Sequence, residues 1–141
     1  MEEFKLEEIE QIYHKTLKYR TITKEEREII NSLFPISPCK EKGTVDYIEN
    51  NSIQIKDYNA LSKDFDFTKL YSENGFKFEE DIAISFDDLQ SIDIINGSDL
   101  CKYFNFLWYP IAEDMIIINL SFTKVLLLTH YGVVLVYDII K

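Results

Sequence analysis

The stretch from Met115 to Ile140, MIIINLSFTKVLLLTHYGVVLVYDII, decides the fold of this chain. Apolar residues occupy 115–118, 125–128 and 133–136 in succession, and short polar segments separate the three runs. Neighbouring side chains of a strand point to opposite faces of its sheet, so a strand that is apolar at successive positions is covered on both faces. We therefore predict three consecutive buried strands. Their short connections, of which His130-Tyr131-Gly132 is one, favour antiparallel neighbours.

Two amphipathic segments precede this block, and we expect both to form helices. Apolar residues recur at helical spacing between Leu6 and Leu17. Thr23 and Glu26 have the spacing of a capping box that opens a second helix, which Pro35 and Pro38 would end. The first forty residues are therefore predicted to form a helical hairpin that covers the sheet.

The segment between the helices and the strand block gives weaker signals. Residues 45–48 and 53–55 are interpreted as two strands of a hairpin, joined through the turn-rich segment 49–52. Ser98 can cap a short helix that ends near Phe104. The predicted fold class is α+β: an N-terminal helical hairpin packed on a mainly antiparallel sheet that ends in a C-terminal three-strand meander.

Length and composition predict a single domain over residues 1–141. Cys39 and Cys101 lie far apart without a metal-binding or redox motif, so we interpret both as idle or buried thiols. No apolar run approaches the roughly 18 to 20 residues that span a bilayer. The acidic segment that begins at Met1 lacks the features of a secretion signal. We expect a cytoplasmic protein with no membrane partner.

The net charge of −10 makes nucleic acids and anionic lipids poor partners and favours a basic protein. From Gly43 onward there are sixteen acidic residues against seven basic ones. No lysine or arginine lies between Lys77 and Lys102, where seven acidic residues occur: Glu79, Glu80, Asp81, Asp87, Asp88, Asp93 and Asp99. We interpret this segment as a docking face, with a solvated surface or a divalent metal site as alternatives. The ligand spacing of an EF-hand is missing, and we predict no metal or other cofactor.

His130 is the candidate residue for an alternative, enzymatic function. A histidine beside a carboxylate, here Asp114 or Asp138, can act as a general base. The sequence contains no nucleophile elbow, no glycine-rich phosphate loop and no His/Cys cluster with metal-ligand spacing. We therefore expect a protein that is not an enzyme and has no catalytic residues. A third alternative is an accessory domain that binds a ligand in an apolar pocket between helices and sheet.

The segment Trp108-Tyr109-Pro110-Ile111-Ala112-Glu113-Asp114, the strand to Asn119 and the hairpin 122–132 resemble the C-terminal part of small bacterial immunity proteins. These inhibitors are carried beside polymorphic toxins, including those of contact-dependent growth inhibition. The resemblance lies within the C-terminal quarter of the chain. It implies a non-enzymatic inhibitor that binds a cognate toxin domain in the cytoplasm and occludes its active site. For a nuclease toxin with a basic active site, an acidic inhibitor can occupy the place of the nucleic acid.

Acidic residues and neighbouring aromatic residues supply the candidate partner-binding site, because protein interfaces favour aromatic anchors with a charged rim. The candidates are Asp87, Asp88, Asp93, Glu113, Asp114, Trp108 and Tyr109. Trp108 can equally be a core residue. The expected partner is a basic toxin protein, not nucleic acid or a membrane, and the sequence makes no prediction of the oligomeric state.

Overall fold

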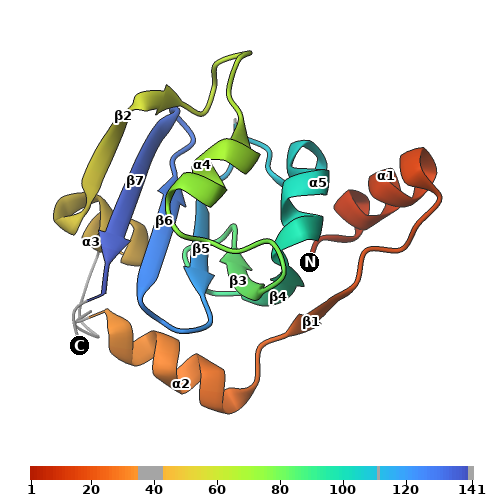
Figure 1. Cartoon of the computed structure of the whole chain (residues 1–141). Coiled ribbons are helices and arrows are strands. Elements are labelled where there is room, and N and C mark those ends of the chain that lie inside the picture. The colour runs from red at the N-terminus through yellow and green to blue at the C-terminus, as the bar shows by residue number, and fades with distance from the viewer. Residues whose placement is uncertain (35–42, 111, 140–141) are drawn as a thin grey trace.

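The computed structural model describes residues 1–34, 43–110 and 112–139. They form an α+β fold with five helices and one seven-stranded antiparallel sheet (Figure 1), which confirms the predicted fold class. The helices are α1 (Glu3–Tyr13), α2 (Lys24–Leu33), α3 (Thr44–Asn51), α4 (Phe67–Glu73) and α5 (Gly97–Leu107). The strands are β1 (Tyr19–Thr21), β2 (Ile53–Asn59), β3 (Asp81–Ser85), β4 (Asp93–Asn96), β5 (Met115–Asn119), β6 (Lys124–Leu128) and β7 (Val133–Asp138).

The strand order is β1-β4-β3-β5-β6-β7-β2, so the predicted C-terminal meander β5-β6-β7 lies inside the sheet. Its register places Ile117 opposite Leu126 and Leu127 opposite Leu135. The turn between β6 and β7 contains Gly132, whose φ of 95° suits a residue without a Cβ. The successive apolar residues of β5 and β6 are buried, as expected for strands that are covered on both faces.

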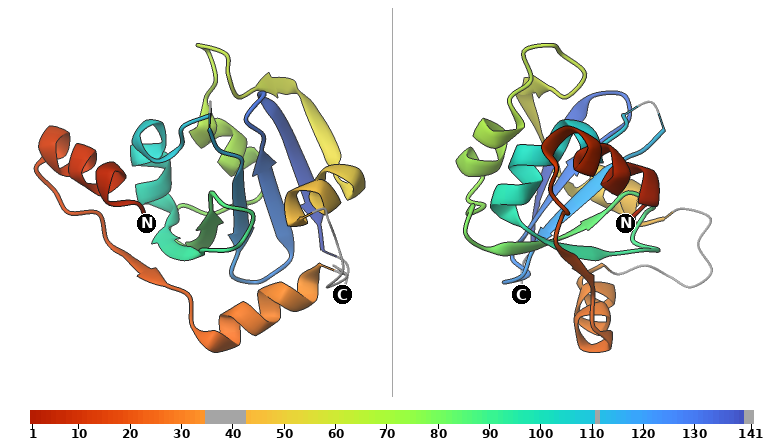
Figure 2. Two further views of the ribbon diagram at one scale, coloured as in Figure 1. Left: turned by 180° about the vertical axis from the view of Figure 1, so that it is seen from behind. Right: turned by 90° about the vertical axis from the view of Figure 1, so that its right-hand side faces the viewer.

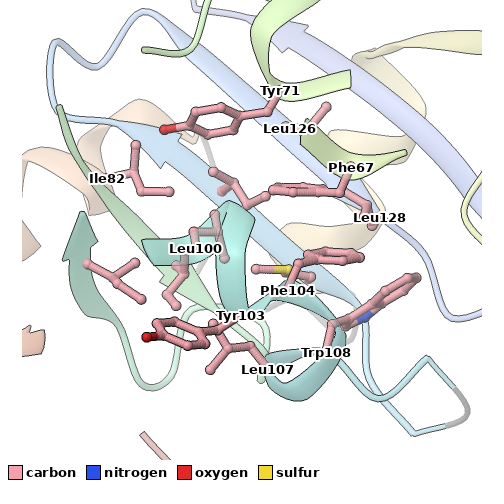
Figure 3. Packing of buried hydrophobic residues seen from close by; sticks show 14 of the residues in the cluster. Phe67, Tyr71, Ile82, Leu100, Tyr103, Phe104, Leu107, Trp108, Leu126 and Leu128 are labelled. Carbon is pink, nitrogen blue, oxygen red and sulfur yellow. The ribbon is translucent and has the colours of Figure 1, made fainter. Parts of the chain in front are cut away.

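The sheet separates two hydrophobic cores, because alternate residues of each strand point to opposite faces. One core joins Ile117 and Leu126 to α1, α4 and α5. Figure 3 shows the aromatic part of this core, in which the Phe67 and Phe104 rings stack with centroids 4.0 Å apart. The other core joins Ile116 to α2 and α3 on the opposite face.

The two N-terminal helices differ in arrangement from a simple hairpin. α1 packs beside α5, whereas α2 belongs to the other core, and the views of Figure 2 show the two helices apart. The short strand β1, which was not predicted from the sequence, lies between them and pairs with β4. The chain therefore crosses the edge of the sheet after α1, and each face receives one N-terminal helix.

The helix α2 begins at the predicted capping box. The Thr23 side chain accepts a hydrogen bond from Glu26 N at 3.2 Å, and the Glu26 carboxylate accepts one from Thr23 N at 2.8 Å. The residues predicted to end this helix, Pro35 and Pro38, lie outside the described residues, as does Cys39.

The prediction of a strand over 45–48 is wrong, because these residues belong to α3. The N-cap residue of α3 is Gly43, which has no side chain to accept hydrogen bonds from the first turn. Asp88, in the connection between β3 and β4, supplies the cap instead, since its carboxylate accepts from Thr44 N at 3.2 Å and from Val45 N at 2.7 Å. A cap from a distant part of the chain leaves no local signal in the sequence. The other predicted strand of the hairpin, 53–55, lies within β2, which pairs with β7 and not with 45–48.

Candidate partner-binding site

Asp87 and Asp88 organise the connection between β3 and β4. Asp87 Oδ1 accepts hydrogen bonds from Ser85 Oγ at 2.9 Å and from Ser91 N at 2.8 Å. Asp88 caps α3, as described above. Both carboxylates thus already have structural partners.

Glu113 and Asp93 pair with cations of the N-terminal segment. Lys5 is completely buried, and its Nζ donates to both carboxylate oxygens of Glu113 at 2.9 Å. The same ammonium lies 3.6 Å from the centroid of the Phe86 ring. Burial raises the pKa of Glu113, and the Lys5 ammonium opposes that rise. Asp93, also buried, forms an ion pair with the amino group of Met1 at 2.8 Å.

The two aromatic candidates serve the packing of the same region. Trp108 is 4% exposed and belongs to the core of Figure 3, where its Nε1 donates to the Glu113 carbonyl at 3.0 Å. The alternative that Trp108 is a core residue is therefore what the structure shows. The Tyr109 hydroxyl donates to Glu8, and this bond, together with partial burial, raises the pKa of Tyr109 to about 12. Burial likewise raises the pKa of the Cys101 thiol to about 11.

Asp114 and His130 form a pair that joins two connections of the chain. Asp114 Oδ1 accepts a hydrogen bond from His130 N at 2.7 Å and lies 2.8 Å from His130 Nδ1. Asp138, the other carboxylate considered for His130, instead lies 3.7 Å from Lys124 Nζ. Of these two candidate partners, the structure pairs Asp114 with His130.

Three connections meet at one end of the sheet, which we call the loop end: 60–66 between β2 and α4, the described residues 108–110 and 112–114 between α5 and β5, and 129–132 between β6 and β7 (Figure 1). The Asp114–His130 pair joins the second and third, and Ala60 N donates to the Gly132 carbonyl at 2.9 Å to join the first. Two large apolar side chains at the loop end, Leu61 and Tyr131, are each 50% exposed. The loop end thus presents apolar surface beside acidic residues.

A bulge in β2 builds a groove next to the loop end. Gln54 lies opposite Leu135 and Asn59 lies opposite Val133, so residues 55–58 face Val134 alone. Extra residues in one strand bend it and redirect its side chains. The resulting cavity of about 530 Å³, which we call the β2–α4 groove, is lined by Asp57, Tyr58, Asn59, Ser62, Asp64, Phe65, Asp66, Lys69 and Glu73.

Aromatic contacts and hydrogen bonds fix the wall of the β2–α4 groove. The rings of Tyr58 and Phe65 meet edge to face with centroids 6.1 Å apart, and Phe65 packs in turn on Phe104. The Tyr58 hydroxyl donates to Glu73 at 2.9 Å. Desolvation of the hydroxyl and this hydrogen bond raise the pKa of Tyr58. The wall is therefore ordered before any partner arrives.

The rim of the groove has four carboxylates and one ammonium. Asp66 caps α4 by accepting from Lys69 N at 3.1 Å, and Glu73 lies 3.8 Å from Lys69 Nζ. The carboxylates of Asp57 and Asp64 have no hydrogen bond or ion pair with any described residue. The groove therefore carries unneutralised negative charge beside two aromatic rings.

The groove was not predicted from the sequence, because lysines dilute the local charge. Lys56 and Lys63 lie among the acidic residues in the sequence, but neither lines the cavity. The signal that could have revealed the site is Asp64-Phe65-Asp66-Phe67, in which acidic and aromatic residues alternate.

Within 1–34, 43–110 and 112–139, no group of three or more His, Cys, Asp and Glu side chains is arranged to hold a metal ion. In the same ranges, no helix has the length and apolar character needed to cross a bilayer. Comparison with protein-family models, with curated proteins and with solved structures finds no match to this chain.

Proposed function

We propose that this chain is an immunity protein, which binds a basic toxin domain in the cytoplasm and occludes its active site. Two observations carry the proposal: the exposed side chains of Leu61 and Tyr131 at the loop end, and the acidic β2–α4 groove, whose lining residues Asn59 and Ser62 flank Ala60 and Leu61 in the chain. Apolar anchors next to a charged rim are typical of protein interfaces. The resemblance of segment 108–132 to immunity proteins supports the same class.

The proposed interface leaves out most of the partner-binding residues that were chosen from the sequence alone. Asp87, Asp88, Asp93 and Glu113 hold the fold together, so their charges are partly neutralised or shielded. Asp114 stays in the proposed interface, because its pair with His130 lies at the loop end. Carboxylates that lack an internal partner contribute most to the field that attracts a basic protein.

A nuclease toxin is the target that best fits this charge. A nuclease binds phosphates through a basic surface, and an acidic inhibitor that covers this surface competes with the nucleic acid directly. A standard interface of about 800 Å² per partner would suffice, with charge accelerating the encounter and buried apolar side chains slowing dissociation.

The test is binding to the toxin domain encoded in the neighbouring reading frame, measured by calorimetry and by stopped-flow association. Asp57→Asn/Asp64→Asn removes two groove charges without removing a described hydrogen bond. Glu7→Gln/Glu10→Gln on α1 is the matched control, because it changes the net charge equally.

We expect the groove variant to slow association about tenfold at low salt, and the control to retain nearly the wild-type rate. Tyr131→Ala should accelerate dissociation. Failure of the neighbouring toxin domain to bind, or equal effects of the two charge variants, would overturn the proposal for this surface.

The His130–Asp114 pair supports a second candidate function, an enzyme that neutralises its target by acid–base chemistry. The Nδ1–Oδ1 distance of 2.8 Å is that of a general base oriented by a carboxylate. Titration of toxin activity separates the candidates: a binding inhibitor abolishes activity at an equimolar ratio, whereas an enzyme does so far below it. Loss of substoichiometric protection in His130→Ala would assign the chemistry to this pair.

A further inference from the structure

We infer that the β2–α4 groove receives an arginine side chain of the protein partner. The inference deepens the proposed function and rests on it for the partner. Its basis is the combination of a preformed cavity, two fixed aromatic rings and carboxylates without internal partners among the described residues. A cavity of about 530 Å³ lies in the range of pockets for small ligands, and it can hold an extended side chain with part of its backbone.

The chemistry of the lining matches a guanidinium group. A guanidinium is planar and weakly hydrated, so it stacks on aromatic faces while its N–H groups bond to carboxylates. The groove offers the rings of Tyr58 and Phe65 together with the carboxylates of Asp57 and Asp64. A lysine ammonium is compact and strongly hydrated. It would be attracted by the charge of the groove but would not stack on the aromatic rings as a guanidinium does.

The β2 bulge disfavours a different mode of binding, in which a partner adds a strand to the edge of the sheet. β2 is an edge strand, but residues 55–58 are out of regular register with β7. Bulges and charged residues such as Lys56 protect an edge against strand pairing. The bulge instead directs Asp57 and Tyr58 into the groove lining, which favours recognition of a side chain.

Lys69 gives the inference a test by gain of affinity. Its ammonium lies 3.8 Å from Glu73, and its side chain is 64% exposed. Such surface pairs add little to stability, yet this positive charge repels a second cation in the groove. Lys69→Gln should therefore bind an arginine probe several-fold more tightly without loss of the fold.

The experiment is a titration of the ¹⁵N-labelled chain with Nα-acetyl-arginine amide, followed by NMR. The lysine and citrulline amides are the control probes, since lysine keeps the charge and citrulline keeps the planar shape. We expect shifts confined to 57–59 and 62–73, with arginine bound more tightly than lysine and no binding of citrulline. Asp57→Asn/Asp64→Asn should weaken arginine binding about tenfold, and Glu7→Gln/Glu10→Gln should leave it unchanged.

Equal affinity for arginine and lysine, shifts spread over the whole acidic surface, or binding of citrulline would overturn the inference. The two proposals can fail separately. If the neighbouring toxin domain does not bind but the arginine amide occupies the groove, the immunity function is wrong and the arginine site stands. If the toxin domain binds but the arginine amide causes no shifts at the groove, the arginine site is wrong.

Discussion

Replacement of Asp88 by alanine tests whether α3 depends on a cap from a distant part of the chain. The Asp88 carboxylate accepts from Thr44 N and Val45 N, and loss of a helix N-cap costs about 1 to 2 kcal/mol. Asp88 also has a φ of 59°, a left-handed conformation that costs alanine about 1 kcal/mol more. We expect Asp88→Ala to lower the free energy of unfolding by about 2 to 3 kcal/mol. Asp88→Asn, which keeps an acceptor and tolerates this φ, should cost about 1 kcal/mol.

Gly43 sharpens this test, because the cost of adding a methyl group there should depend on the residue at position 88. Gly43 has a φ of −87°, which any residue adopts. A Cβ at this position would overlap the Asp88 carboxylate, so Gly43→Ala should displace the cap and cost about 1 to 2 kcal/mol. In the Asp88→Ala background the overlap is gone, so the cost of Gly43→Ala should fall to about 0.5 kcal/mol, which remains because glycine is a better N-cap residue than alanine.

The assay is urea unfolding of the four combinations at positions 43 and 88, followed by far-UV circular dichroism. Comparable slopes against urea would show that the denatured states are alike, so that the free energies can be compared. Glu7→Gln, on the exposed side of α1, is the control for a lost surface charge. Asp88→Ala within about 0.5 kcal/mol of wild type, or the same effect of Gly43→Ala in both backgrounds, would refute the distant cap.

Three further predictions concern stability. Lys5→Met should lower the free energy of unfolding by about 2 kcal/mol, because it leaves the partly buried Glu113 without its counter-charge, and Glu113→Gln in the same background should restore most of it; no recovery in urea unfolding would contradict this. The hydrogen bond from Arg20 and that from the Thr23 backbone lower the pKa of Glu26 from 4.5 to about 2. The folded-state pKa is therefore below the unfolded one, so this stabilisation is present above about pH 4.5 and is lost as the pH falls towards 2. Because the pair is exposed, we expect about 1 kcal/mol, and Glu26→Gln should flatten the loss in unfolding curves between pH 5 and 2; an unchanged slope would contradict it. Leu126→Ala should cost about 2 to 5 kcal/mol, since the side chain is fully buried, and a smaller loss in thermal unfolding would mean that the core closes around the cavity.

The strand block and the capping box could be predicted from the sequence because each depends on neighbouring residues. Successive apolar positions in β5 and β6 directly reflect burial on two faces. The Thr23–Glu26 pair lies within a single helical turn. By contrast, α3 depends on its cap from Asp88, and the shape of β2 depends on its pairing with β7. Neither could be predicted from neighbouring residues, because both partners are distant in the sequence.

The candidate site was harder to predict, because a count of charges along the chain does not reveal which charges have partners. Asp93 is acidic in the sequence but lies in a buried strand beside an ammonium group. Asp57 and Asp64 lie among lysines in the sequence but converge on a groove away from Lys56. Only the fold separates carboxylates that hold the structure together from those that face solvent.

The positions of β1 and β2 at the two edges of the sheet bear on the synthesis of this chain. Both strands are synthesised before their partners, β4 and β7. Ile53 of β2, for example, can pair with Val136 only after nearly the whole chain has been made. Until β7 emerges, β2 has no partner strand and β6 is paired on one side only, with β5, so both expose strand edges of the kind that aggregate. Pairing between such distant segments is also slow. A nascent chain has no complete sheet, so its β2–α4 groove is not yet formed. Under the proposed function, a cell is therefore protected by the folded molecules that it already contains.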